Sequence, residues 1–441
     1  MRKLIVLFLL LSFHVYSQTY KIGCGPGNFQ NGYTALKDAG IWLTRVAHDF
    51  RNSDISSGVP SQPIIEQFDL KIQDAQSKGL YVVGILNPRR ENDGTWPTSN
   101  TMASVLGFFV ERYDGDGTSD FPNLKYPIKY WEICNEYESN PVDPDDPNWQ
   151  WKGLSQATYF EFCTKSKQAL KMAYSSGYFS AGSIVGKPND GFKYLINNGF
   201  TPDFISFHGY SPTDFCVTEG RSELSNVSSS LDAIPLVITE CAFYDNLPDG
   251  YNATQLKNAK WLAMALSQAF NLNTQFVIYT EFMADSMWTD PRLLWMTMID
   301  KNGVKRPNYY TFKKLNETIG QFNSISKVTT STGANLYKYD LGSNQVVYIA
   351  WTDSSDGGTI QVPSLDSCNY VTVTNTVPNT TSDIVDDPVT FNEWTVNVNS
   401  GTAKVVVTSD IPVYIVPHTA VVAYTVSYDA NGATSGTAPA S

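Results

Sequence analysis

The chain has 441 residues, of which 42% are hydrophobic and 13% are aromatic, and its formal net charge at pH 7 is -12. A chain of this length is expected to form two domains or more. The excess of acidic side chains disfavours nucleic acid as a partner and favours a neutral substrate.

The first 17 residues have the features of a secretory signal peptide. Arg2 and Lys3 precede an apolar run from Leu4 to Phe13, and the residues VYS at 15–17 are small enough at their first and third positions for cleavage before Gln18. The apolar run is too short to span a membrane, and no later segment approaches about 18 uninterrupted apolar residues. We therefore expect a secreted or cell-surface protein without a membrane span.

Residues 18–322 alternate between strand and helix patterns, which predicts a (β/α)8 TIM barrel. The expected strands are Tyr20–Cys24, Ile41–Val46, Leu80–Leu86, Ile128–Ile133, Tyr178–Val185, Asp203–Phe207, Leu236–Thr239 and Phe276–Thr280. Amphipathic helices are expected at Ile64–Ala75, Ala157–Ala173, Leu256–Phe270 and Tyr309–Leu315. The main alternative is a doubly wound open sheet. The glycine-rich run KIGCGPG at 21–27 lacks the dinucleotide-binding pattern that such a sheet usually carries.

After Phe322 the helical period gives way to short alternating segments separated by Gly, Asn, Asp and Ser. Residues 323–417 therefore predict a C-terminal antiparallel β-sandwich domain. Residues 418–441 form a different segment that looks like the start of a truncated surface-type repeat or a tail. If further repeats follow, they would provide attachment to the cell surface.

Two of the expected strands end in a glutamate. Glu136 closes the run YWEICNE after the fourth strand, and Glu240 closes PLVITE at the end of the seventh. A single glutamate after a strand is usually a solvated loop residue, but two at corresponding strand ends predict an active site at the carboxyl face of the barrel. Arg45, at the end of the second strand, is the cation that could keep one carboxylate ionised. Glu281 competes with Glu240 for the nucleophile, and two neighbours of Glu136 could be mistaken for the acid: Glu132 and Glu138.

Other kinds of active site find little support in the sequence. The four histidines are scattered, which disfavours a zinc hydrolase, and no nucleophile elbow or phosphate-binding loop is present, so neither a metal nor a cofactor is expected. Most of the six cysteines are interpreted as buried thiols. The acidic run DGDGTSD, with Asp114, Asp116 and Asp120, fits a solvated turn better than a calcium loop. Trp149 and Trp151 could form an outer sugar subsite or a packed loop.

The runs WEICNE and VITE, together with DFISFHGY at 203–210, resemble the clan of retaining glycoside hydrolases with (β/α)8 barrels, and most closely families 5 and 39. In family 39 a proline usually follows the acid/base glutamate, and here Tyr137 stands in its place. The resemblance implies that Glu136 is the acid/base and Glu240 the nucleophile. It further implies the following substrate-binding residues: Asn135 holding the 2-hydroxyl of the sugar, Arg45 and Tyr210 bonded to the nucleophile, His208 lining the sugar subsite and Trp288 forming its floor.

The sequence thus predicts a secreted retaining β-glycoside hydrolase that acts on a polysaccharide or oligosaccharide by double displacement. A non-catalytic carbohydrate-binding surface protein and a transglycosylase with the same site remain as alternatives. Retention requires the two carboxyl groups to lie about 5 to 5.5 Å apart, whereas roughly 6.5 to 9.5 Å would indicate inversion.

Overall fold

The computed structural model describes residues 21–27, 31–137, 151, 153–211, 213–243, 255–285, 287, 296–380, 389–408 and 410–419. The expected signal peptide, Trp149, Trp288 and residues 420–441 lie outside the described residues. No helix in the described part of the chain combines the length and the apolar character that crossing a bilayer requires.

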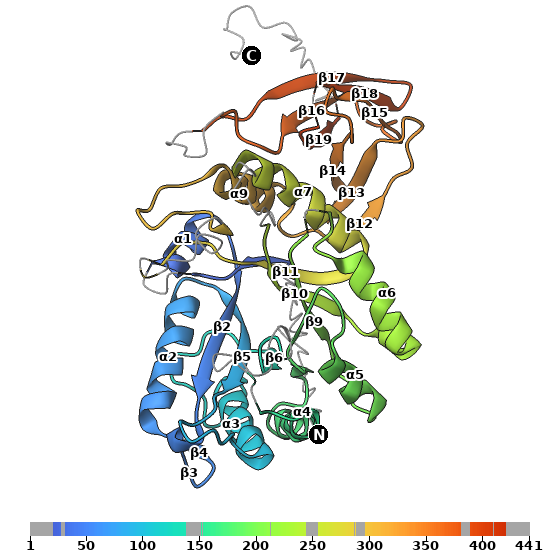
Figure 1. The fold of residues 1–441 in the computed structure, drawn as a ribbon. Coiled ribbons are helices and arrows are strands. Elements are labelled where there is room, and N and C mark those ends of the chain that lie inside the picture. The colour runs from blue at the N-terminus through green and yellow to red at the C-terminus, as the bar shows by residue number, and fades with distance from the viewer. Residues whose placement is uncertain are drawn as a thin grey trace, which may run out of the picture.

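Parallel strands form the centre of the molecule, and each strand expected in residues 18–322 is present (Figure 1). They pair in two sheets of orders β1-β11-β10-β9-β8 and β2-β5-β6-β7. Their bounds are β1 Ile22–Cys24, β2 Leu43–Phe50, β5 Tyr81–Pro88, β6 Tyr130–Ile133, β7 Tyr178–Ser180, β8 Ser183–Val185, β9 Ile205–Gly209, β10 Leu236–Cys241 and β11 Thr274–Tyr279. The expected barrel is therefore confirmed, with its fifth strand divided into β7 and β8.

The two sheets meet at two seams. At one, the chain runs from β7 to β8 through Gly182, whose positive φ of 73° favours glycine and where a Cβ would lie 2.3 Å from the carbonyl oxygen of Cys134. At the other, the hydroxyl of Thr44 on β2 donates to the carbonyl of Cys24 on β1 over 2.9 Å. These contacts join the nine strand segments into one barrel.

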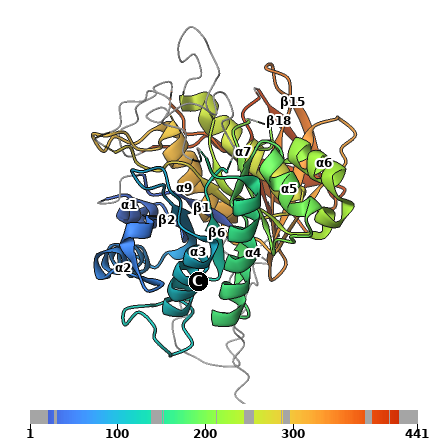
Figure 2. The ribbon, with the colours of Figure 1, turned by 60° about the horizontal axis from the view of Figure 1, so that its bottom comes forward.

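Helices surround the strands, as Figure 2 shows. Their bounds are α1 Gly32–Asp38, α2 Gln62–Ser77, α3 Ser99–Arg112, α4 Gln156–Ala173, α5 Asp190–Asn197, α6 Val217–Val227, α7 Gln255–Asn271 and α9 Pro307–Ile319. The four helices expected from apolar periodicity correspond to α2, α4, α7 and α9. A short hairpin that the sequence pattern did not predict, β3 (Ile55–Ser56) and β4 (Val59–Pro60), follows β2.

The barrel interior changes from apolar to polar along the strands. Since alternate strand residues face the same side, positions two apart form successive layers. The lower layer is an apolar cluster that includes Leu43, Val83, Phe204, Val237 and Phe276. One step further toward the carboxyl ends, the strands present Arg45, Glu132, Ser206 and Thr239, which are hydrogen-bonded to one another or to neighbouring strands. This polar layer lies directly beneath the ends of the strands.

The C-terminal region consists of antiparallel strands that lie over α7 and α9 (Figure 1). In chain order they are β12 Ser324–Lys327, β13 Asn335–Gly342, β14 Gln345–Trp351, β15 Gly358–Val362, β16 Tyr370–Asn375, β17 Glu393–Asn399, β18 Thr402–Val407 and β19 Val413–His418. The hydroxyl of Tyr339 donates to Ser267 on α7 over 2.8 Å. The pairing joins all eight strands in one order, so antiparallel structure is confirmed and the two separate layers of a sandwich stay a prediction.

All six cysteines of the chain are free thiols, and Cys24, Cys134, Cys163 and Cys241 are buried, as expected. Burial raises the pKa of each of these four well above its ordinary value, so they remain protonated packing groups.

Candidate active site

The carboxyl ends of the barrel strands bring together six of the residues that the sequence singled out: Arg45, Asn135, Glu136, His208, Tyr210 and Glu240. They come from four different strands or the turns that follow them. Their meeting is the geometric consequence of parallel strands ending at one face.

Glu240 lies on β10, where a register shift relative to β9 occurs between Ile238 and Glu240. The irregularity lets Thr239 face the barrel interior while the next side chain reaches the upper face. The carboxylate of Glu240 accepts a hydrogen bond from the Tyr210 hydroxyl and lies 3.5 Å from Nη1 of Arg45. Burial, followed by the charge of Glu240, raises the pKa of Tyr210 well above its ordinary value, so the hydroxyl keeps its proton and acts as a donor.

Glu136 lies three residues beyond the end of β6. Both Cys134 and Glu136 have left-handed backbone conformations, with φ of 59° and 51°, which non-glycine residues rarely adopt outside sites where the surroundings enforce them. Tyr137 fixes the next turn: it is buried, stacks on Tyr159 at 3.8 Å between ring centroids and donates its hydroxyl to the carbonyl of Leu154. This packing accounts for an aromatic residue at the position where family 39 members usually have proline.

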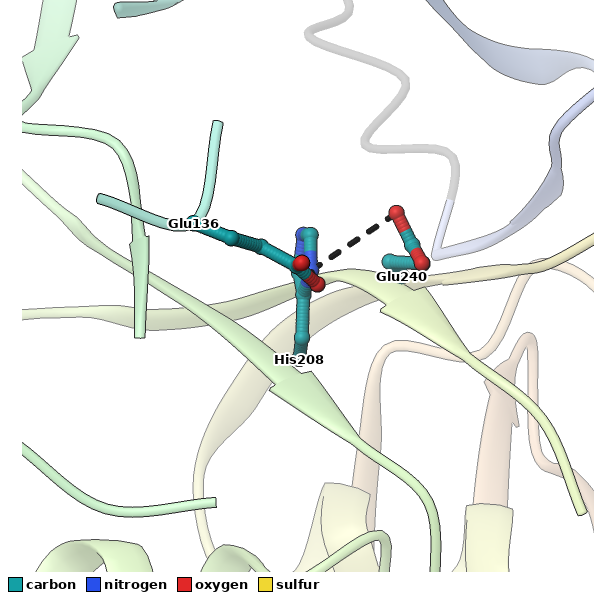
Figure 3. A group of neighbouring side chains, drawn as sticks. All are labelled: Glu136, His208 and Glu240. Atoms are coloured by element: carbon teal, nitrogen blue, oxygen red, sulfur yellow. Dashed lines mark hydrogen bonds and ion pairs between the residues drawn. The ribbon is translucent and has the colours of Figure 1, made fainter. Parts of the chain in front are cut away.

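His208 lies between the two glutamates. Its Nδ1 is 2.6 Å from Oε1 of Glu136 and 3.6 Å from Oε2 of Glu240, and its side chain is fully buried. Figure 3 shows Glu136 and Glu240 on either side of the imidazole. Carboxylate oxygens of the two glutamates lie within 4.8 Å of each other.

The same three side chains are close enough to meet around one cation. Arg45 already places a positive charge beside Glu240, and His208 already bonds Glu136. Because these protein groups satisfy the carboxylates, the arrangement is better suited to proton transfer and nucleophilic attack than to holding a metal.

Arg45 connects the site to the polar layer beneath it. Its Nε donates to Oε2 of Glu132 over 2.7 Å, and its Nη2 donates to Oδ1 of Asn135 over 2.7 Å and to the Ser183 hydroxyl over 3.2 Å. Burial lowers the pKa of Arg45, but the charges of Glu132 and Glu240 more than offset this and the net shift is upward. Of the four side chains that Arg45 contacts, Glu240 is the most distant, at 3.5 Å.

Glu132 is a candidate positioning residue that the sequence analysis considered only as a rival acid. It is completely buried and receives bonds from Arg45 and from the Thr239 hydroxyl, so it holds Arg45 in place. The available signal was its position two residues after Tyr130 on a buried strand, which places it in the barrel interior at the level of Arg45.

Asn135 is fixed from two further directions. Its amide N–H donates to Oδ1 of Asn87 over 2.9 Å, and its carbonyl accepts a bond from Nε1 of Trp151 over 3.0 Å. Trp151 is 1% exposed and stacks on Trp96, so the interpretation of Trp151 as part of an outer sugar subsite is wrong. Its indole is buried because it closes the turn that carries the candidate catalytic residues.

Glu281 follows β11 and faces the same cavity as Glu240. Burial, and next the charge of Glu240, raises the pKa of Glu281 to about 7, although Arg45 and the amide of Gly27 act in the opposite direction. A carboxyl that holds its proton near neutrality is a weaker nucleophile than one bonded to Arg45 and Tyr210.

The acidic run at 114–120 forms a turn away from these strand ends. Asp120 accepts bonds from the amides of Gly115 and Gly117, and Asp114 and Asp116 each accept one from an amide two residues later. Burial is the main reason that the pKa of Asp114 rises to about 6. The carboxylates thus stabilise the turn itself. Because the three are also close enough to meet around one cation, the preference for a solvated turn over a calcium loop stays a prediction.

Comparisons with known proteins report on the fold. No family model matches the chain. No curated protein matches it either. Solved structures do match over nearly the whole length of the chain. A glucosidase from Croceicoccus marinus has a TM-score of 0.61 at 12% sequence identity, with 92% of this chain and 96% of that one covered.

Two further structures are glycoside hydrolases of families 39 and 30. A family 39 β-xylosidase from Caulobacter crescentus has a TM-score of 0.60 at 16% identity, covering 91% of this chain and 96% of the other. A family 30 endoxylanase from Clostridium papyrosolvens has a TM-score of 0.55 at 13% identity, covering 91% and 97%. The resemblance to the clan is confirmed in the fold: over most of its length the chain has the fold of these glycoside hydrolases, among them a family 39 enzyme.

Proposed function

We propose that this protein is a retaining β-glycoside hydrolase in which Glu240 is the nucleophile and Glu136 the acid/base. One observation carries the proposal. Two carboxylates with oxygens within 4.8 Å of each other occupy different environments: Glu240 faces Arg45 and receives the Tyr210 hydroxyl, whereas Glu136 is bonded to His208. Such a division of environments is what a double displacement requires.

In the first step, an oxygen of Glu240 attacks the anomeric carbon and Glu136 donates its proton to the departing glycosidic oxygen. The carbon–oxygen bond of the substrate breaks as the ester bond to Glu240 forms. Arg45 and Tyr210 hold the attacking oxygens in one orientation, and Asn135, fixed by Arg45 and Asn87, faces the 2-hydroxyl of the sugar.

In the second step, Glu136 accepts a proton from water, and the water oxygen attacks the anomeric carbon and releases Glu240. The separation of the carboxylates supports retention, because inversion needs room for a water molecule and a spacing of roughly 6.5 to 9.5 Å. His208, bonded to Glu136 through Nδ1, orients the carboxyl that changes its protonation state twice per turnover.

The test compares the wild-type protein with Glu240→Gln and Glu136→Gln on a panel of aryl β-glycosides and polysaccharides. Glu66→Gln is the matched control, because Glu66 is exposed on the outer helix α2. We expect both site variants to lose activity by about 100-fold or more while the control retains it. The first product, followed by NMR, should keep the β configuration.

Azide identifies the two roles separately. With Glu240→Ala, azide should restore turnover in a single displacement and yield an α-glycosyl azide, whereas with Glu136→Ala two displacements should yield the β-glycosyl azide. Undiminished activity of the Glu240 variants would overturn the nucleophile assignment. Sugar binding without turnover by the wild-type protein would indicate the non-catalytic alternative, and preferential transfer to an added sugar would indicate a transglycosylase.

The same proposal includes export and domain organisation. We propose removal of residues 1–17, a catalytic barrel over residues 18–322 and a β-sandwich over 323–417. Val405 and Val407 on β18 share an apolar cluster with Leu336 on β13 and Ala350 on β14, which supports folding of the sheet over itself. We also propose that residues 418–441 begin a repeat of the surface type, through which the protein attaches to the cell surface. Trp288 is proposed to form the floor of the sugar subsite. N-terminal sequencing of the exported protein tests the cleavage site.

A further inference from the structure

The glycine-rich run after β1 forms part of the candidate active site. Gly25, Pro26 and Gly27 line a cavity of about 210 Å³ together with Arg45, Glu240 and Glu281. The run therefore has a place at the carboxyl face of the barrel, although it lacks the dinucleotide-binding pattern.

The two glycines approach the Glu281 carboxylate closely. A Cβ on Gly25 would lie 3.3 Å from Oε2 of Glu281, and one on Gly27 would lie 3.2 Å from the same oxygen. Gly27 has a φ of 67°, and a Cβ there would also lie 2.0 Å from the carbonyl oxygen of Met283. A side chain is therefore excluded at Gly27, and the amide of Gly27 bonds the Glu281 carboxylate.

The cavity wall on this side is acidic. Glu240, Glu281 and Asp285 line it, and among the described lining residues Arg45 alone is cationic. Each nitrogen of the Arg45 guanidinium already has a partner in Glu132, Asn135, Ser183 or Glu240. No described cation of the cavity is therefore available to a negatively charged group of a substrate.

We propose that Glu281 is a specificity-determining residue: with the backbone of Gly25–Gly27 it receives hydroxyl groups of the sugar bound at Glu240, and it selects neutral sugars against uronic acids and sulfated sugars. This inference rests on the proposed glycosidase function and adds a substrate class to it. Glu281 takes no part in bond formation.

The chemistry of the wall explains the selection. With a pKa of about 7, the Glu281 carboxyl is present in both its protonated and its ionised form near neutrality. In either form its oxygens accept hydrogen bonds from sugar hydroxyls, and the ionised form makes the stronger bonds. A uronate or sulfate in the same place would lie against the carboxyl groups of Glu240, Glu281 and Asp285, with no unengaged cation among the described lining residues. Burial, and after it the negative charge of Glu240, raises the pKa of Glu281, so a further negative charge beside this carboxyl would be unfavourable.

The experiment measures kcat and KM for pairs of aryl β-glycosides that share a configuration and differ only in a hydroxymethyl or a carboxylate group, namely glucoside against glucuronide and galactoside against galacturonide. The proteins are the wild type, Glu281→Gln and the control Glu66→Gln. Glu281→Gln keeps the shape of the side chain and removes its charge. Thermal melting checks that each variant is folded.

We expect the wild type to prefer the neutral member of its best pair by about 100-fold or more in kcat/KM. Glu281→Gln should reduce that preference by about 10- to 100-fold. For the neutral substrate, kcat/KM should fall mainly because KM rises, as expected for loss of a charge-assisted hydrogen bond. The control should leave the preference unchanged. If Glu281→Gln fails to fold, the kcat/KM ratio of the wild type for the neutral and the charged substrate can still overturn the inference.

Four results would overturn the inference. Wild-type turnover of a uronide within 10-fold of its neutral counterpart would do so, and so would an unchanged preference in folded Glu281→Gln. Loss of kcat in Glu281→Ala with restoration by azide would make Glu281 the nucleophile. Failure of the wild type to cleave any glycoside would overturn the proposed function and this inference with it, whereas the first two results leave the proposed function intact.

Discussion

Arg45 donates from Nε to Oε2 of Glu132 over 2.7 Å, and the glutamate is completely buried below the candidate active site. A buried carboxylate without its cation is costly, so this pair must remain complete. Arg45 in turn holds Asn135 and faces Glu240. The orientation of both thus depends on a residue that no substrate touches.

Glu132→Ala should lower the free energy of unfolding by about 3–5 kcal/mol, because it leaves the Arg45 charge buried beside an empty space. Urea unfolding followed by circular dichroism measures the change. The exposed Glu66→Ala should alter it by no more than about 0.5 kcal/mol. Equal stability of the two variants would mean that the pair contributes nothing to the fold.

Tyr210→Phe should reduce kcat/KM by about 10- to 100-fold, because it removes a hydroxyl that donates to the Glu240 carboxylate. The loss should appear in kcat rather than KM, since the bond orients the attacking group. Tyr194→Phe on α5, whose ring packs on Phe160 at the outside of the barrel, is the control. An unchanged kcat in Tyr210→Phe would remove this tyrosine from the site.

Glu281 should make stability depend on pH. Its pKa is raised from 4.5 to about 7 in the folded protein, so between these values the unfolded chain releases a proton that the folded protein retains. Unfolding therefore becomes easier as the pH rises through this window, and the effect is complete above pH 7.

Glu281→Gln abolishes that effect, so its melting temperature should rise relative to the wild type by several degrees between pH 4.5 and pH 8. Parallel melting curves at both pH values, with Glu66→Gln as the reference, measure the difference. If the difference in melting temperature between Glu281→Gln and the wild type is the same at both pH values, the raised pKa of Glu281 is contradicted.

Calcium should have no effect on the turn at 114–120. Its three aspartates already accept backbone amide bonds, which stabilise the turn without a cation. Melting temperatures in excess EDTA and in millimolar calcium should agree within about 1 °C, a shift that corresponds to well under 1 kcal/mol. A calcium-dependent rise that Asp116→Asn removes would show a binding site instead.

Strand prediction succeeded where one local pattern was sufficient, and the same patterns led to the candidate site, which stays a prediction. Buried β-branched runs located the barrel strands, and strand ends carrying Glu136 and Glu240 located the site, because parallel strands place their carboxyl ends together. The split between β7 and β8 was not visible, since it depends on the carbonyl of Cys134 approaching Gly182 from another strand.

It was harder to predict from the sequence which side chains contact one another. Alternation indicates that a residue such as Glu132 faces inward but not which side chain it meets, so its bond to Arg45 could not be read from the sequence. Trp151 illustrates the converse, because an indole in a polar loop has the same composition signal whether it faces a sugar or the carbonyl of Asn135. Short edge strands such as β12 and β15 carry too few residues to show a period.

The polar layer also limits how this barrel can be altered. Arg45, Glu132, Ser183, Ser206 and Thr239 belong to five different strands and share hydrogen bonds. The effects of substitutions within the group on the free energy of unfolding should be non-additive, so that a second substitution lowers it by less than the first. To redesign the carboxyl face of the barrel for another sugar, all five of these residues would have to be kept, and only the loops and side chains above them could be varied.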